Sequence, residues 1–130
     1  MGWHVPSDTE WTIMEKYLVL NGYNWNGSKG PYNKIAKSLA AKTAWIPDTN
    51  EGTIGCDLTL NNRTGFSALG SGFRFDNGSF CGQSAGEIWW SATESSAPFA
   101  YSRELSSNDD NIFRGCHDKM CGFSVRLLKD

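Results

Sequence analysis

The stretch IWWSATESSAPFAYSREL, residues 88–105, contains two segments in which apolar and polar side chains alternate. Alternation with a period of two is typical of a strand that buries one face, so residues 88–93 and 101–105 are predicted to be strands. The segment GFSVRL, residues 122–127, alternates in the same way and predicts a closing strand.

A first helix is predicted upstream of these strands. The motif SDTE at residues 7–10 is a capping box, in which Ser7 would cap the helix and Glu10 would bond back to it. The apolar residues Trp11, Met14 and Leu18 follow at helical spacing, with Tyr17 alongside. Asn21-Gly22 is a typical helix end.

A second helix is predicted to begin near Pro31 and to end before Trp45. Its apolar stripe would consist of Ile35, Ala36, Leu39 and Ala40. Four lysines in this part of the chain fit the solvent side of the same helix: Lys29, Lys34, Lys37 and Lys42.

Residues 47–65 are rich in Asn, Asp, Thr and Gly and predict a long irregular connection. The motif DNGS at 76–79 is a strong hairpin signal, with residues 73–75 entering and Phe80 returning. We therefore predict an α+β fold, with two helices packed on a small twisted antiparallel sheet and long irregular loops. A chain of 130 residues is expected to form one domain, residues 1–130.

Composition excludes several function classes. The formal net charge of −2, from 12 basic and 14 acidic residues, provides no basic face for nucleic acid. No apolar run approaches the ~20 residues that cross a bilayer, so direct membrane insertion is not expected. The start MGWH lacks the basic and apolar regions of a signal peptide. Six Trp, seven Phe and fourteen Gly predict an aromatic core in a loop-rich domain.

Four sequence blocks occur in a characteristic order: GWHVPSDTEW at 2–11, GFSALGSGFR at 65–74, WWSATES at 89–95 and GFSVRLLKD at 122–130. Together they resemble the Fibrobacter succinogenes major paralogous domain, found in surface lipoproteins of Bacteroidetes and Fibrobacter. The resemblance implies a C-type lectin-like fold, shared with formylglycine-generating enzymes and with the variable proteins of diversity-generating retroelements. It also implies a place on a bacterial surface or in association with phage.

The chain departs from the family pattern in two respects. Members usually have a strand and a Cys before the block that begins at Gly2, and a Cys at the position of Leu127. We therefore expect this domain to lack the family's N-terminal strand and one disulfide.

The resemblance assigns a ligand-binding role to residues 95–121. In retroelement-diversified members, the region before the closing strand is rewritten at adenines of a template, and Asn codons are the usual targets. The irregular mixture of residues at 108–117 is consistent with such sampling. The candidate ligand-binding residues are Phe99, Tyr101, Arg103, Asn108, Asp110, Ile112, Phe113, Arg114, Cys116, His117 and Met120.

These candidates are predicted to be exposed and free to vary, on a hairpin that turns at residues 107–110. In a less specific interpretation, Phe113 and Leu105 belong to the core and the remaining residues are solvated. The recognition role would be lost if Arg103, Ile112, Arg114 and His117 were found in the interior.

Metal sites were considered for two motifs. The segment NDDN at 108–111 is rich in oxygen ligands, but its spacing is not that of an EF-hand, and a turn is the better interpretation. Cys116-His117 with Cys121 could bind Zn or Cu, but a fourth ligand is missing. Four cysteines allow three disulfide pairings, which the sequence leaves open: Cys56, Cys81, Cys116 and Cys121.

No catalytic constellation is evident. His4 precedes a helix and fits a structural hydrogen bond, and Glu94 with Glu104 lacks a visible pocket. The adjacent rings Trp89 and Trp90 would point to opposite faces of a strand. Because Trp90 is in step with Ile88 and Ala92, we assign Trp90 to the interior.

We therefore expect a non-enzymatic recognition module that requires no cofactor and binds a protein or glycan on another cell or a phage. One alternative is a structural domain of a larger surface lipoprotein with no ligand of its own. A third, less favoured hypothesis is a copper oxidase of the formylglycine-generating type. Ligand identity and oligomeric state do not follow from the sequence.

Overall fold

Helix α1 (Asp8–Leu20) begins at the predicted capping box in the computed structural model, which describes residues 1–130. Ser7 Oγ accepts a hydrogen bond from the Glu10 N–H, and the Ser7 N–H donates to the Glu10 carboxylate in return. The helix ends at Asn21, followed by Gly22 with a φ of 79°, so both predicted ends are confirmed. Its buried side chains are Trp11, Leu18 and Val19.

The predicted second helix is reduced to a single turn, α2 (Ala36–Leu39). The predicted length was wrong because the flanking backbone bonds to other segments. The Ala36 N–H donates to Asp110 O, and the Ala41 N–H donates to Ala68 O. The predicted apolar stripe is nevertheless confirmed, since all four of its residues are buried.

Lys37 does not face solvent as predicted; it is only 6% exposed. Its ammonium donates to oxygens of a segment that includes the short 3₁₀ helix η1 (Leu58–Leu60). The acceptors are Thr53 O at 3.3 Å, Asp57 O at 2.9 Å, Asn61 Oδ1 at 2.9 Å, and Cys56 O. The lysine therefore fastens α2 to the irregular connection predicted at 47–65.

The main sheet contains β4 (Gly86–Ser96), β5 (Phe99–Ser106) and β6 (Phe113–Asp118), antiparallel and in the order β4-β5-β6. The first two strands include the segments predicted at 88–93 and 101–105. The third strand is formed by residues that were predicted to be part of an irregular variable region.

The prediction of a regular closing strand at residues 122–127 was wrong. It forms isolated bridges only, between Gly122 and Arg74 and between Ser124 and Trp89. The chain then leaves the sheet, and β7 (Leu128–Lys129) pairs with β1 (Trp3–His4). Backbone pairing is thus divided between three partners, which prevents a continuous ladder.

The hairpin predicted at DNGS is confirmed: β2 (Phe73–Arg74) pairs with β3 (Phe80–Cys81). Gly78 takes a φ of 88° in the turn, a conformation in which a side chain would be strained. The Ser79 N–H and hydroxyl both bond to Asn77 Oδ1, which closes the turn.

Two aromatic clusters lie on opposite faces of the main sheet. Trp89 is 4% exposed and packs against Trp11 of α1 and Phe66 in the main core. Trp90 is half-buried on the other face, with its ring centroid 4.3 Å from that of Phe123. The assignment of Trp90 alone to the interior was wrong, because the sheet is covered on both faces.

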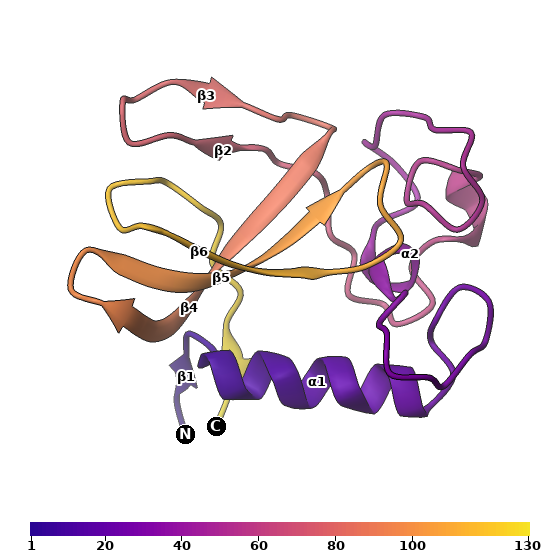
Figure 1. The fold of residues 1–130 in the computed structure, drawn as a ribbon, viewed down its shortest axis with the longest axis horizontal. Coiled ribbons are helices and arrows are strands. Elements are labelled where there is room, and N and C mark those ends of the chain that lie inside the picture. Colours follow the sequence, from indigo (N-terminus) through magenta and orange to yellow (C-terminus); the bar gives the residue numbers. More distant parts are fainter.

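Figure 1 shows the resulting arrangement. Helix α1 runs along one side of the main sheet, the β2–β3 hairpin lies on the other side, and α2 with its long loops occupies one end. Both termini meet beside the first turn of α1. The model is therefore an α+β domain with several small antiparallel sheets, and neither helix has the length or apolar character that crossing a bilayer requires.

His4 joins the two ends of the chain. Its Nδ1 lies 2.7 Å from Asp130 Oδ1, and its Nε2 lies 3.0 Å from Glu10 Oε1. The hydrogen bond with Asp130, then that with Glu10, raises the pKa of His4 above its ordinary 6.5. The bonds from the Ser7 backbone and hydroxyl, followed by the His4 contact, lower the pKa of Glu10 to about 2.

This contact makes stability pH-dependent. A histidine with a raised pKa stabilises the fold fully below its unfolded pKa, and the stabilisation is lost as pH rises through the folded pKa. We expect the Tm of the wild type, relative to that of His4→Gln, to fall by roughly 1–3 °C between pH 6 and pH 8.5. A Tm difference between the two proteins that stays constant over this range would contradict the prediction.

Candidate recognition surface

Strand β6 forms one edge of the main sheet, with β5 as its only neighbour. Every residue of β6 is at least partly exposed, and the most exposed are Phe113, Arg114 and Cys116. We define the β6 surface as the side chains of Tyr101, Phe113, Arg114, Cys116 and His117. The strand thus presents aromatic, cationic, imidazole and thiol groups at an open edge.

The pairing register divides these side chains between two faces. Tyr101 pairs with Cys116, and Arg103 pairs with Arg114, on the face that α1 covers in part. Glu104 pairs with Phe113, and Ala100 pairs with His117, on the opposite face. Residues directly opposite each other in an antiparallel pair share a face, so the surface wraps around the edge strand.

Arg103 does not belong to the exposed surface, and its predicted display was wrong. Its side chain is completely buried between the sheet and α1. The guanidinium and Nε carry five N–H donors, and all have acceptors. These are Glu15 Oε1, Asp8 Oδ1 at 2.7 Å, Ser102 O at 3.0 Å, Asp8 O at 3.2 Å and Thr12 Oγ1 at 3.1 Å.

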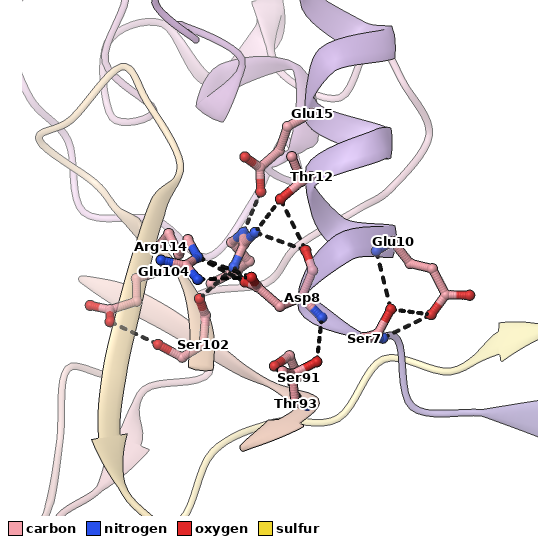
Figure 2. Close-up of polar contacts among 11 residues, drawn as sticks. Ser7, Asp8, Glu10, Thr12, Glu15, Ser91, Thr93, Ser102, Glu104 and Arg114 are labelled. Atoms are coloured by element: carbon pink, nitrogen blue, oxygen red, sulfur yellow. Dashed lines mark hydrogen bonds and ion pairs between the residues drawn. The ribbon is translucent and has the colours of Figure 1, made fainter. Parts of the chain in front are cut away.

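Arg103 therefore fastens the central strand to the first two turns of the helix. Figure 2 shows Asp8, Thr12 and Glu15 turned toward the strands from one side of α1. Burial raises the pKa of Glu15, although the hydrogen bond from Arg103 opposes this shift. The hydrogen bond from Arg114, with that from Arg103, lowers the pKa of Asp8.

Arg114 is held in place but remains accessible. Its Nε and Nη2 donate to both oxygens of Asp8 at 2.9–3.1 Å (Figure 2). Its guanidinium lies 3.8 Å from the Tyr101 ring centroid. The side chain is still 49% exposed, and Nη1 makes no hydrogen bond to Asp8. The hydrogen bond to Asp8 raises the pKa of Arg114, so the charge is permanent.

His117 is paired with Glu104 on the opposite face. Its Nε2 lies 2.5 Å from Glu104 Oε1, which also accepts a hydrogen bond from Ser102 Oγ at 3.0 Å. The His117 ring meets Phe123 edge to face at 5.0 Å. Gly115 provides room for this arrangement, since a Cβ there would lie 1.8 Å from Glu104 Oε1.

A groove of about 370 Å³ adjoins this pair. Phe73 and Phe113 line it together with Glu104 and Asp109. It contains two carboxylates and no basic side chain. Its surface is accordingly suited to aromatic and cationic groups of a ligand.

The connection between β5 and β6 does not join the β6 surface. Ile112 was predicted to be displayed, but it is 3% exposed and belongs to the main core. Asn33 holds its backbone through hydrogen bonds at 2.8 and 3.1 Å. Asp110 accepts a bond from Trp25 Nε1 at 3.1 Å, so this candidate also serves to anchor a loop. Asn108 is exposed in the same turn, away from the edge.

Two candidates lie at the opposite end of the hairpin. Phe99 is 40% exposed at the start of β5, and Met120 is 68% exposed in the loop after β6. The register places Phe99 opposite Asp118, two residues from Met120. They extend the exposed apolar area beyond the β6 surface, at the end far from Asn108.

All four cysteines are free thiols in the structure. Cys116 Sγ lies 2.8 Å from Ser95 Oγ. No group of three or more His, Cys, Asp or Glu side chains lies close enough together to hold a metal ion. Asp109 and Asp110 belong to a turn that is bonded through its backbone to Ile54 and Ala36.

The sequence hypothesis missed the partners that organise this surface. Asp8, Thr12 and Glu15 lie at i, i+4 and i+7, which places three polar groups on one face of α1. Such spacing is also typical of the solvent-facing side of a helix, so by itself it does not indicate a buried cation. Glu104 was considered only as a partner of Glu94, whereas its contact is His117.

Comparisons with known proteins gave one match. The family model described as the Fibrobacter succinogenes major domain matches residues 1–129. No match was found among curated proteins or among solved structures.

Proposed function

Since this chain belongs to the Fibrobacter succinogenes major domain family, we propose that it is a non-enzymatic recognition module. Its ligand-binding area is the β6 surface. The ligand is a protein or a glycan on the surface of another cell or a phage. The proposal includes a C-type lectin-like arrangement of the α+β fold.

The observation that carries the proposal is the fixed and accessible Arg114 guanidinium. Arginine and tyrosine dominate binding hot spots because they bury much area and bond in defined directions. Asp8 and the Tyr101 ring already hold Arg114 in one orientation. A ligand would therefore immobilise few additional torsions, and the free Nη1 donors could bond to its oxygens.

The scaffold beneath the surface supports the same function. The buried guanidinium of Arg103 links β5 to α1 through four of its five donors. A strand fixed in this way changes its backbone little when a partner binds. Affinity would therefore depend on the exposed side chains of the neighbouring edge strand.

Diversification of residues 95–121 by a retroelement is part of the proposal only for exposed positions. Arg103 and Ile112 are buried, and replacing either would damage the core. Gly115 has no room for a Cβ unless Glu104 moves. The candidate positions that can vary at small cost are the exposed ones: Phe99, Asn108, Phe113, Arg114, Cys116 and Met120.

Binding of the labelled protein to a glycan array and to intact bacteria tests this function. We expect the double variant Tyr101→Ala/Arg114→Ala to bind the wild-type target at least about tenfold more weakly. Its Tm should change by only a few degrees, because Arg114 is exposed on the edge strand and Tyr101 is only partly buried beside it. Affinity is measured by titration on the target that the wild type selects.

The matched control is Ile13→Ala/Tyr17→Ala on α1. These two side chains are 62% and 61% exposed, but they lie outside the β6 surface. The control should bind as the wild type does. If both double variants lose binding equally, or only the control loses it, the β6 surface is not the ligand site. If the wild type selects no target, the structural-domain hypothesis is favoured.

A further inference from the structure

A pocket of about 320 Å³ lies between α1 and the C-terminal segment, on the helix side of the sheet. Its walls are mostly apolar and come from Met14, Phe66, Leu127 and Leu128. The volume is at the lower end of the range for small-molecule sites in proteins. None of the candidate ligand-binding residues lines it.

Trp11 lines this pocket and carries an unsatisfied donor. The residue is 2% exposed, and its indole Nε1 is buried without a hydrogen-bond partner. Its ring instead packs against Trp89 and Phe66. A water-sized group does not reach this N–H, so Trp11 contributes the apolar face of its ring to the pocket wall.

Arg126 also lines the pocket and forms no ion pair or hydrogen bond within the chain. Its guanidinium lies over the Phe66 ring, 4.2 Å from the centroid. Glu10 is the other charged residue here, but Ser7 and His4 already occupy its carboxylate. Arg126 is therefore the uncommitted charge of the pocket, and it is positive.

We propose that this pocket binds a small organic anion, with an apolar chain or ring and one carboxylate. The apolar part would contact Met14, Leu127 and Leu128. The carboxylate would pair with Arg126, and the Trp11 ring would form part of the apolar wall beside the ligand. This site is separate from the β6 surface and does not depend on the recognition function proposed above.

Titration with sodium octanoate, followed by ¹H–¹⁵N NMR of the tryptophan indole N–H signals, tests the proposal. The Trp11 signal is identified through its contacts to the Phe66 and Trp89 rings. We expect it to shift and to saturate as octanoate is added, because the Trp11 ring lines the pocket. Arg126→Gln should weaken binding about tenfold, the usual value of one charge-assisted hydrogen bond.

Two matched controls make the result specific. Octylamine has the same chain with a positive head group, and it should leave the Trp11 signal unmoved. Arg63→Gln removes another exposed arginine that lies over a ring, that of Tyr23, and it should bind octanoate as the wild type does. The same spectra report whether each variant is folded.

Three results would overturn the proposal. The first is the absence of a saturable shift of the Trp11 signal with octanoate. The second is an equal response to octylamine, which would indicate adsorption without charge recognition. The third is unchanged octanoate affinity in folded Arg126→Gln.

Discussion

Replacing Arg103 by Met is expected to lower the free energy of unfolding by about 3–5 kcal/mol, as measured by urea denaturation. Met fills a similar length of the buried channel, but it offers no donor to Asp8, Thr12 or Glu15. The Glu15 carboxylate would be left partly buried without a compensating charge, and Asp8 would keep only Arg114. Removing one member of a buried ionic group is costly for this reason.

The control for this variant is Arg114→Met, which changes the same side chain on the neighbouring strand. Arg114 also bonds to Asp8, but it is half exposed, and an exposed pair contributes about 0–1 kcal/mol. If the free energy of unfolding falls by a similar amount in the two variants, the buried ionic contacts of Arg103 do not have the expected importance for stability. A loss below 1 kcal/mol for Arg103→Met would contradict the prediction directly.

The loss of unfolding free energy in Arg103→Met, relative to the wild type, should also depend on pH. Burial already raises the pKa of Glu15 in the wild type, where Arg103 opposes the effect. Without the arginine, the folded state would bind the Glu15 proton more tightly still. Stability then falls as pH rises, because the folded state binds more protons than the unfolded state. The difference between the two proteins should be larger at pH 8 than at pH 5.

The sequence predicted local structure well where one short segment determines it. The capping box at residues 7–10, the turn at 76–79 and the alternation at 88–93 each contain their own physical cause. These elements were found where they were expected. The α+β class followed from their order along the chain.

Elements whose backbone partners are distant were predicted poorly. The span assigned to the second helix is held by Asp110 and Ala68, which lie far away in the sequence. The alternating residues 122–127 meet Arg74 and Trp89 at single bridges only. A periodic pattern indicates that a segment has an apolar and a polar face. It does not indicate how many of its residues form backbone hydrogen bonds with a neighbouring strand.

The candidate site failed in part for a chemical reason. Alternation placed Arg103 in step with Leu105, on the face that proved to be buried, but arginine is rarely buried and was therefore assigned to solvent. Asp8 and Glu15, which bind the Arg103 guanidinium, lie on one side of α1, and their helical spacing is the only trace of these ion pairs in the sequence. Ile112 was misplaced because the resemblance assigned the whole of residues 95–121 to the ligand surface, although this side chain is apolar and belongs to the core.

Lys37→Met is expected to lower the free energy of unfolding by about 2–4 kcal/mol. The Lys37 ammonium occupies a position where four oxygens converge, and burial lowers the pKa of this group. Methionine would retain the stem and remove every donor. Each oxygen left without a partner in the interior costs about 1–3 kcal/mol, and relaxation of the segment and entry of water recover part of the total.

Hydrogen exchange should locate this loss in the irregular connection. The Asn62 N–H donates to Lys37 O, and the Asn61 side chain bonds to Ala41 O and Ile54 O, so the lysine holds a segment that is bonded on both sides. Amides of residues 53–62 should exchange faster in Lys37→Met. The exchange rates of amides in β4 and β5 should change only as much as the global free energy of unfolding requires. Lys42→Met is the control, because Lys42 is exposed and should change stability by less than about 0.5 kcal/mol. Equal effects of the two substitutions would show that the hydrogen bonds from the Lys37 ammonium to the four oxygens do not stabilise the fold.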